Sequence, residues 1–303
     1  MRGSLRDWWE IARPFSWTAS VVPVLVGAAV AADLGFFRLP ELLLTLVGAV
    51  LLQIGTNIVN EVVDVERGVD TAETAGASRV VLEGRLPART AFRAGVASLV
   101  AALVIGLWLA VRSTLWVLGL GALGALAGYL YTAGPKGYKY LALGVPLVFL
   151  LMGPLEVLAS FMVQSGRFDL LPVWTSLPVG FLVAAILHGN DMRDLALDRR
   201  AGIATLAGLV GLPTSAWIYR FLLAGAYGVV LLLAALQALP WTALLVLLSL
   251  PAAAEPWRHV TRGLADEREL LPVEPLSARL HMVFGLLLAL GTGLPALLGG
   301  VGL

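Results

Sequence analysis

The chain contains no cysteine and only three histidines among its 303 residues. The absence of cysteine excludes a disulfide framework, a thiolate metal site and a cysteine nucleophile. Charged residues are also scarce, at 14% of the chain, whereas a soluble globular domain carries about 25%. The formal net charge of +1 gives no indication of a nucleic-acid partner or of a strongly acidic one.

Hydrophobic residues, by contrast, make up 59% of the chain. A soluble protein of this length could not bury so much apolar surface, so we expect a lipid bilayer to surround it. The apolar runs lack the alternation of a lipid-facing β-barrel, so the sequence predicts an all-α integral membrane bundle of nine transmembrane helices. Each helix needs about 20 mainly apolar residues, and the nine segments are Phe15–Ala32, Glu41–Val59, Thr90–Val111, Leu115–Tyr131, Leu141–Val163, Leu170–Leu187, Thr214–Leu236, Leu239–Ala254 and Leu280–Leu298.

The positive charges predict the orientation of these spans. With the N-terminus in the cytoplasm, 17 of the 21 lysines and arginines fall on the cytoplasmic side, and only Arg38, Arg112 and Arg167 fall outside. This asymmetry follows the positive-inside rule. The short polar N-terminus is not followed by a small-residue cleavage site, so we expect no signal peptide. We therefore expect a multi-pass protein of the cell (inner) membrane with a cytoplasmic N-terminus.

Two matched groups of polar residues follow the second and sixth apolar segments. Both contain Asn-acid-x-x-Asp and then a further Asp, at Asn60–Asp70 and at Asn190–Asp198. On a helix, residues four apart share a face, so Asn60 would align with Asp64, and Asn190 with Asp194 and Asp198. One motif lies at the cytoplasmic end of a helix in each half of the chain, which indicates an internal duplication with the two sites facing each other. We therefore expect one membrane domain over residues 1–303, built of two pseudo-repeated halves.

Carboxylates gathered in this way repel one another unless a cation lies among them. Hard oxygen ligands suit Mg²⁺, which takes one or two carboxylates together with substrate phosphates and water. Two such ions would neutralise a diphosphate. The metal-site and catalytic candidates are Asp64, Asp70, Asp191, Asp194 and Asp198, and the cations nearby that could hold phosphate oxygens are Arg67, Arg79, Lys139 and Arg193.

At these residues the sequence resembles the UbiA superfamily of intramembrane prenyltransferases, and within it the 1,4-dihydroxy-2-naphthoate polyprenyltransferase branch. The branch is expected to carry Asp where this chain has Glu61, and Asn where it has Asp191, and Glu156 is not a residue that the resemblance predicts. The motifs that carry the resemblance are Arg13-Pro14, Arg67-Gly68-Val69-Asp70, Ser78-Arg79-Val80, Tyr131-Thr132-Ala133-Gly134-Pro135, Gly153-Pro154, Arg199-Arg200-Ala201-Gly202 and Thr205-Leu206-Ala207.

The resemblance implies an all-helical bundle of nine spans around a central cavity, with the active site facing the cytoplasm and the isoprenoid tail in an apolar tunnel open to lipid. It implies metal ligation by Asn60, Asp64 and Asp70 on one side, and by Asn190, Asp191, Asp194 and Asp198 on the other. The implied reaction is Mg²⁺-dependent transfer of a polyprenyl group from polyprenyl diphosphate to an aromatic acceptor, 1,4-dihydroxy-2-naphthoate in menaquinone biosynthesis. The sequence gives no sign of an obligate protein partner.

Several alternatives remain open at this point. Another acceptor, such as 4-hydroxybenzoate or homogentisate, would use the same chemistry. A secondary transporter could also carry intramembrane acids, although an inverted repeat would place the two motifs on opposite sides of the membrane. Tyr131 could lie over an allylic cation or could be an interfacial tyrosine. His188 could be a base, a polar residue near the site or a structural residue, and Glu156 could be functional or simply protonated or hydrogen-bonded.

Overall fold

The computed structural model describes residues 3–66, 68, 78–132, 141–200 and 202–299. Within these ranges the chain forms helices and no strand, apart from one isolated bridge between Leu141 and Ala204, which confirms the all-α prediction. The helices are α1 (Leu5–Ala12), α2 (Thr18–Asp33), α3 (Leu39–Glu66), α4 (Ala88–Arg112), α5 (Trp116–Thr132), α6 (Gly144–Leu150), α7 (Glu156–Ser165), α8 (Leu171–Arg193), α9 (Leu195–Arg200), α10 (Leu206–Val210), α11 (Leu212–Ala235), α12 (Leu250–Gly263) and α13 (Val273–Gly299).

Seven helical segments in the described part of the chain are long and apolar enough to cross a bilayer. They correspond to all of the predicted spans except Leu115–Tyr131 and Leu239–Ala254. The first of these two contains a shorter apolar helix over Trp116–Gly128. The second divides into a 3₁₀ helix over Trp241–Ser249 and then α12, which begins with proline in its first turn. The protein is thus a multi-pass helical bundle, and a total of nine crossings stays a prediction.

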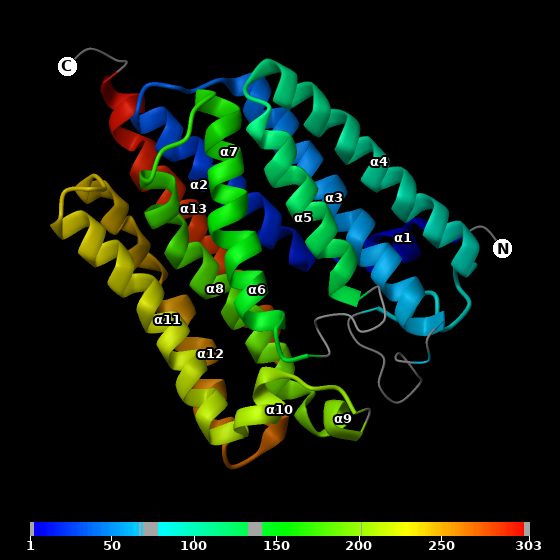
Figure 1. The fold of residues 1–303 in the computed structure, drawn as a ribbon. Coiled ribbons are helices and arrows are strands. Elements are labelled where there is room, and N and C mark those ends of the chain that lie inside the picture. The colour runs from blue at the N-terminus through cyan, green and yellow to red at the C-terminus, as the bar shows by residue number, and fades with distance from the viewer. Residues whose placement is uncertain (1–2, 67, 69–77, 133–140, 201, 300–303) are drawn as a thin grey trace.

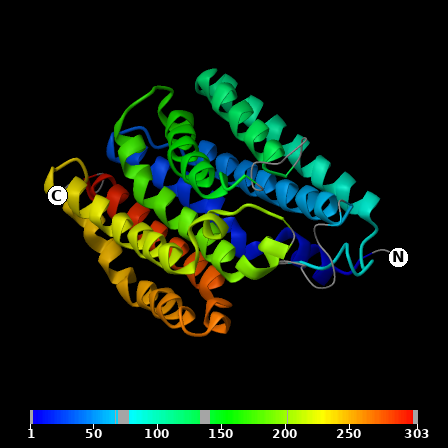
Figure 2. The ribbon, with the colours of Figure 1, turned by 60° about the horizontal axis from the view of Figure 1, so that its bottom comes forward.

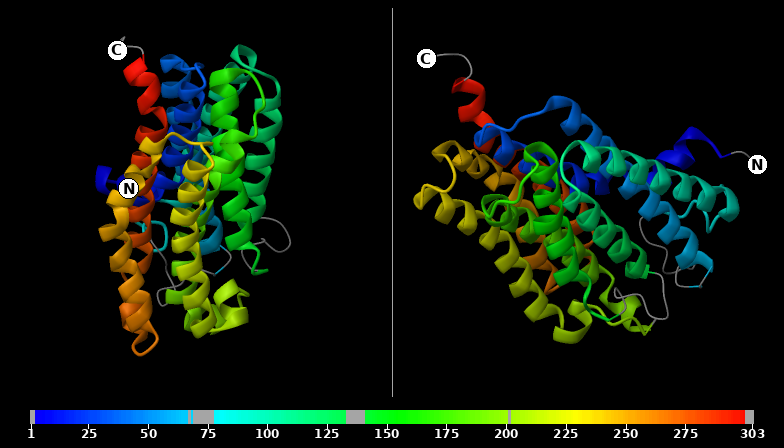
Figure 3. Two further views of the ribbon diagram at one scale, coloured as in Figure 1. Left: turned by 90° about the vertical axis from the view of Figure 1, so that its left-hand side faces the viewer. Right: turned by 45° about the horizontal axis from the view of Figure 1, so that its top comes forward.

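The helices of one part of the bundle are well buried, and those of the other part are mostly exposed. Figure 1 shows α3, α4 and α5 grouped together, with α8, α11, α12 and α13 on the other side and α2 and α7 between the two groups. The turned views in Figure 2 and Figure 3 show the same two groups. The largest buried cluster joins α8, α11 and α13, and the most apolar stretch of α8 is 61% buried against 17% for α3 and 22% for α4. The α3–α5 group therefore forms a wall rather than a core.

The fifth predicted span is interrupted between α6 and α7. Residues Leu151–Leu155 form a π-helical turn that contains Pro154, and such turns frequently mark functional sites. Gly153 lies against α8, where a Cβ atom would be only 2.7 Å from the Cα atom of Gly180. Glycine at both positions allows the two backbones to approach closely. The interrupted segment then continues as α7 with Glu156 as its first residue.

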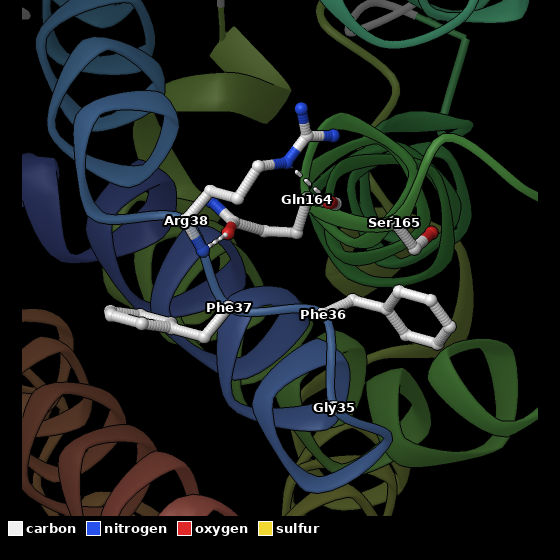
Figure 4. A pocket seen from close by; sticks show the side chains of 6 residues that line it. All are labelled: Gly35, Phe36, Phe37, Arg38, Gln164 and Ser165. Atoms are coloured by element: carbon white, nitrogen blue, oxygen red, sulfur yellow. Dashed lines mark hydrogen bonds between the residues drawn. The ribbon is translucent and has the colours of Figure 1, made fainter.

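The connection between α2 and α3 is fixed to the end of α7 (Figure 4). The backbone nitrogen of Arg38 donates to Oε1 of Gln164 at 2.7 Å, and its guanidinium donates to the carbonyl oxygens of Gln164 and Val163 at 2.9 and 3.1 Å. These carbonyls belong to the last turn of α7, whose acceptors have no partner within the helix. The same guanidinium contacts buried Glu41 at 3.4 Å. Arg38 thereby ties α2, α3 and α7 together at the end of the bundle away from the two Asp motifs.

At the opposite end, the short helix α1 is fixed to the loop before α4. Ser4 and Asp7 form a reciprocal capping box at the start of α1. Arg85 contacts Asp7 at 2.7 Å and Glu10 at 2.6 Å. Hydrogen bonds from Ser4 and then from Arg85 lower the pKa of the Asp7 carboxyl, and Arg85 lowers the pKa of Glu10.

We expect the attachment of α1 to weaken in acid. A carboxyl whose pKa is lower in the folded protein stabilises it above the unfolded pKa, and the stabilisation is lost as pH falls through the folded pKa. The unfolded pKa values lie at about 4, so the loss begins near that pH and continues below it. Replacing Arg85 with Met should lower the melting temperature by no more than a few degrees near neutral pH, because the pairs are partly exposed. It should also flatten the fall in melting temperature between about pH 5 and about pH 3. An Arg85→Met protein whose acid sensitivity equals that of the wild type would contradict this account, and Arg89→Met is the matched control.

Candidate active site

A cavity of about 1120 Å³ lies between the α3–α5 wall and the helices α2, α6, α7 and α8. Typical small-molecule pockets have volumes of about 300–1,000 Å³, so this cavity can take a ligand larger than most. One end is lined by carboxylate and amide side chains, and most of the remaining wall is apolar. Residues of α3 line it from Thr45 to Asp64, which corresponds to about 28 Å of helix. The cavity therefore suits a long amphipathic molecule with an anionic head.

The polar end of the cavity brings the two sequence motifs together. Six of the predicted site residues line it: Asn60 and Asp64 from α3, Asn190 and Asp191 from α8, Asp194 at the end of α8, and Asp198 from α9. Asp64 and Asp191 are each only 8% exposed. Segments separated by about 130 residues thus place their carboxylates at the same end of one cavity. Their roles as metal ligands and catalytic groups stay predictions.

The local structure explains why both motifs face the cavity. Helix α3 continues beyond the apolar stretch that ends at Val59, as far as Glu66, so Asn60 and Asp64 lie one turn apart on the same side of the helix, as their spacing predicted. Gly68, with φ of +68°, follows its end. Helix α8 ends at Arg193 and α9 begins at Leu195, so the predicted continuous face from Asn190 to Asp198 is interrupted at Asp194. The Asp198 nitrogen still donates to the Asp194 carbonyl oxygen at 2.9 Å, which keeps both side chains at the cavity.

Arg193 is bound to carboxylates rather than pointing into the cavity. Its Nε and Nη2 atoms donate to the two carboxylate oxygens of Asp194 at 2.8 and 2.6 Å. Its Nη1 atom forms an ion pair with Glu274, in the first turn of α13. Glu274 also accepts a hydrogen bond from Nδ2 of Asn190 at 3.2 Å, and it lines the cavity. These contacts indicate that Arg193 positions the second motif, and its predicted contact with diphosphate stays a prediction.

Glu274 was not predicted from the sequence as a site residue. Its only signal was an acidic residue just before the last apolar segment, in a charged loop without recognisable spacing. The loop carries several charges that face solvent, such as exposed Glu267 and Arg268, and nothing in the pattern distinguishes Glu274 from them. Only the packing of α13 against α8 brings it to Asn190 and Arg193.

A second group that the sequence analysis missed is a row of polar side chains along α2 and α3. Gln53 accepts a hydrogen bond from Ser20 at 3.1 Å and donates to Asn57 at 3.3 Å. Asn57 in turn donates to the hydroxyl of Ser16 at 2.9 Å. Because Gln53, Asn57, Asn60 and Asp64 recur at helical spacing, the row continues the carboxylate end of the cavity toward its middle.

The remaining predicted residues lie elsewhere. Glu61 is 1% exposed, accepts a hydrogen bond from the backbone nitrogen of Val81 at 3.2 Å and contacts Arg13 at 3.5 Å, so it fastens the loop before α4 instead of facing the cavity. Arg79 is exposed and is not among the residues that line the cavity. Arg67, Asp70, Lys139 and the side chain of Tyr131 lie outside the described residues.

His188 is buried and faces α11. Its Nε2 atom lies 3.1 Å from the carbonyl oxygen of Ser215, so this nitrogen carries the proton that the carbonyl accepts. His188 does not line the cavity. These contacts favour the structural interpretation over a catalytic base.

The donor set of the cavity fits Mg²⁺ chemically. In the part of the chain that the structure describes, no three His, Cys, Asp or Glu side chains are already arranged to hold a metal ion. Mg²⁺ does not require such a cage, because it binds through one or two carboxylates, water and substrate phosphates. Carboxylates that face one another across the cavity, together with the amides of Asn60 and Asn190, could supply these few ligands once a diphosphate brings the rest.

An all-helical membrane bundle with a long, mostly apolar cavity and acids at one end is consistent with a membrane enzyme that binds a metal ion and an amphipathic ligand. Residues 20–283 match the UbiA prenyltransferase family, and the chain belongs to this family. It is therefore a prenyltransferase.

Known relatives align with nearly the whole chain. The 1,4-dihydroxy-2-naphthoate octaprenyltransferase of Bacillus subtilis is 32% identical, with 93% of this chain and 91% of that protein aligned. The protein of the same name from Mycobacterium tuberculosis is 33% identical over 89% of this chain and 91% of its own length. The solved structure of a UbiA homolog from Archaeoglobus fulgidus bound to DMAPP and Mg²⁺ superimposes with a TM-score of 0.60, at 16% identity, over 93% of this chain and 99% of that one. At that identity the structural match supports the fold alone.

Proposed function

We propose that the protein transfers a polyprenyl group from polyprenyl diphosphate to 1,4-dihydroxy-2-naphthoate in an Mg²⁺-dependent step of menaquinone biosynthesis. The observation that carries the proposal is the single cavity in which both Asp motifs face one end of a long apolar space. The names of the bacterial relatives support the naphthoate acceptor, and the ligands of the archaeal homolog support Mg²⁺ and a prenyl diphosphate.

Different residues along the cavity are proposed to bind the metal ions, the diphosphate and the isoprenoid tail. Asp64, Asp191, Asp194 and Asp198, with Asn60 and Asn190, would hold two Mg²⁺ ions, and Asp70 would join them. When bound, Mg²⁺ neutralises the diphosphate as a Lewis acid, which makes it a better leaving group. The apolar wall holds the isoprenoid tail and excludes water from the allylic carbon. Arg79, Arg67 and Lys139 are proposed to contact phosphate or acceptor oxygens, and Tyr131 to face the developing positive charge.

The bond changes follow from this arrangement. The C–O bond to the diphosphate breaks, and its electron pair leaves with the diphosphate. The electron-rich acceptor ring supplies the pair that forms the new C–C bond. Loss of CO₂ from a naphthoate, or of a proton from another phenol, restores the aromatic ring. We propose that this chemistry takes place at the cytoplasmic face of the inner membrane, and the position of the acids at one end of the cavity supports this. We also propose that the membrane domain consists of two related halves.

Purified protein supplied with labelled polyprenyl diphosphate, Mg²⁺ and a panel of aromatic acceptors tests the proposal. We expect a prenylated naphthol that has lost CO₂, detected by mass, and no product when EDTA removes the metal. Product from 4-hydroxybenzoate or homogentisate alone would overturn the acceptor and leave the chemistry in place. Mg²⁺-independent transfer would overturn the role proposed for the Asp motifs.

A further inference from the structure

Glu156 is an acidic residue in the apolar part of the cavity, away from both Asp motifs. It is the first residue of α7, directly after the π-helical turn, and it lines the cavity. Its neighbours on the same lining stripe, Met152, Leu155 and Ala159, are apolar. Its side chain is half-buried, and within the described residues no hydrogen bond or ion pair joins its carboxyl group to another side chain. A carboxyl group in such surroundings is costly without a polar partner.

Contacts between α2 and α7 show how deep Glu156 lies. The two helices run in the same direction, because Arg38, which follows α2, contacts Gln164 at the end of α7. The hydroxyl of Ser160 donates to the Val24 carbonyl oxygen at 2.7 Å. Four residues earlier on each helix, or about 6 Å, lie Glu156 and Ser20. The two residues therefore lie at a similar depth on neighbouring walls of the cavity.

Ser20 connects this level to α3. Its hydroxyl donates to Oε1 of Gln53 at 3.1 Å, and both residues line the cavity. Gln53 lies seven residues before Asn60, which corresponds to about 10 Å along α3. We call Ser20, Gln53 and Glu156 the polar band. It lies between the Asp motifs and the far, apolar end of the cavity.

We propose that the polar band binds a ring hydroxyl of the aromatic acceptor, with a carboxyl oxygen of Glu156 accepting the hydrogen bond. The inference rests on the proposed function. A diphosphate held between the Asp motifs places its first carbon just below them, and an aromatic ring stacked against that carbon extends further into the cavity. The rise of about 10 Å along α3 between Asn60 and Gln53 leaves room for such a ring and its hydroxyl. A hydrocarbon tail offers these polar groups no partner, whereas a phenol does.

The hydrogen bond would select acceptors as well as hold them. A site built to bind a hydroxyl rejects an analogue that lacks it, because its own buried polar group is then left without a partner. A hydroxyl that donates to a carboxyl oxygen is also more electron-rich, and so is the ring that attacks. Glu156 is therefore assigned as a specificity-determining residue for the acceptor, distinct from the groups that hold the diphosphate.

The test compares 1,4-dihydroxy-2-naphthoate with its two monomethyl ethers in wild type, Glu156→Leu, Glu156→Gln and the control Glu267→Leu, which removes an exposed acid. In wild type we expect one ether to react about tenfold less efficiently or worse. Glu156→Leu should raise the KM of the dihydroxy acceptor about tenfold, remove the discrimination between it and that ether, and leave the KM of the prenyl diphosphate unchanged. Glu156→Gln, whose amide oxygen still accepts, should retain the discrimination.

The outcomes separate this inference from the proposed function. Unchanged discrimination in an active Glu156→Leu protein would overturn the inference alone, as would a change in the prenyl diphosphate KM or chain-length preference instead. A wild-type protein that prenylates no acceptor in the panel would overturn the proposed function, and the inference with it. Equilibrium binding of 1,4-dihydroxy-2-naphthoate to each variant, with its melting temperature, shows whether an inactive variant is folded.

Discussion

Replacing Asp64 or Asp191 with alanine is expected to reduce prenyl transfer by at least about a hundredfold, because each change removes a group that faces the charge developing on the diphosphate. Both carboxylates are largely buried at the same end of the cavity, one from each motif. The loss should appear mainly in kcat, since the apolar wall that binds the tail is unaltered. Product formation measured by mass over a range of Mg²⁺ concentrations provides the test.

The matched control for Asp64 lies on the same helix. Glu66 is two residues away, is exposed and does not line the cavity, so Glu66→Ala should keep nearly full activity. Equal losses in Asp64→Ala and Glu66→Ala would show that charge near the end of α3 matters, not a carboxylate at the cavity. Wild-type kcat in either Asp64→Ala or Asp191→Ala would contradict the site.

Replacing Glu274 with leucine is expected to lower activity by about ten- to a hundredfold, in line with the effect of losing an outer partner of a metal site. Glu274 does not need to contact substrate for this. It pairs with Arg193 and accepts from Asn190, so its loss would leave Arg193 bound to Asp194 alone and would free the Asn190 amide. The second motif would then have to be reorganised before it could take up Mg²⁺.

The Mg²⁺ requirement distinguishes a positioning role of Glu274 from a general loss of stability. The Mg²⁺ concentration that gives half-maximal activity should rise in Glu274→Leu, while the KM of the acceptor stays near its wild-type value. Glu269→Leu is the control, because Glu269 pairs with His259 at 2.9 Å in the loop before α13 and does not line the cavity. A loss of activity with an unchanged Mg²⁺ requirement would argue that Glu274 acts only through stability.

The helical architecture and the two Asp motifs were predictable because both depend on residues close together in the sequence. Apolar runs of suitable length gave the helices, and the repeated Asn-acid-x-x-Asp spacing gave the residues that line the polar end of the cavity. The continuation of the second helix through Asn60 and Asp64 was predicted from their spacing, although its end at Glu66 was not. The break at Asp194 was missed for a similar reason: helical spacing alone cannot show where one helix ends and the next begins.

Contacts between distant segments were beyond prediction. Glu274 and Asn190 are 84 residues apart, and only the packing of α13 on α8 joins them. Glu61 occupies an acidic position of the first motif, yet it faces away from the cavity toward Val81 and Arg13. The polar row that includes Gln53 and Asn57 did carry a signal, namely helical spacing to Asn60 and Asp64. It passed unnoticed because those side chains lie within an apolar segment.

The thin α3–α5 wall makes the surrounding hydrocarbon a competitor for the substrate. The helices of this wall have one side to the outside of the bundle and another to the cavity, and little of α3 and α4 is buried. On α5, a Cβ atom added at Gly119 or Gly121 would touch nothing within 4 Å. Because this single layer of helices separates the apolar part of the cavity from the surrounding hydrocarbon, we expect alkyl chains of lipid or detergent to compete with the isoprenoid tail. The solubilising agent is then expected to inhibit with a strength that depends on its chain length, so prenyl diphosphate affinities should be compared only in the same detergent or lipid.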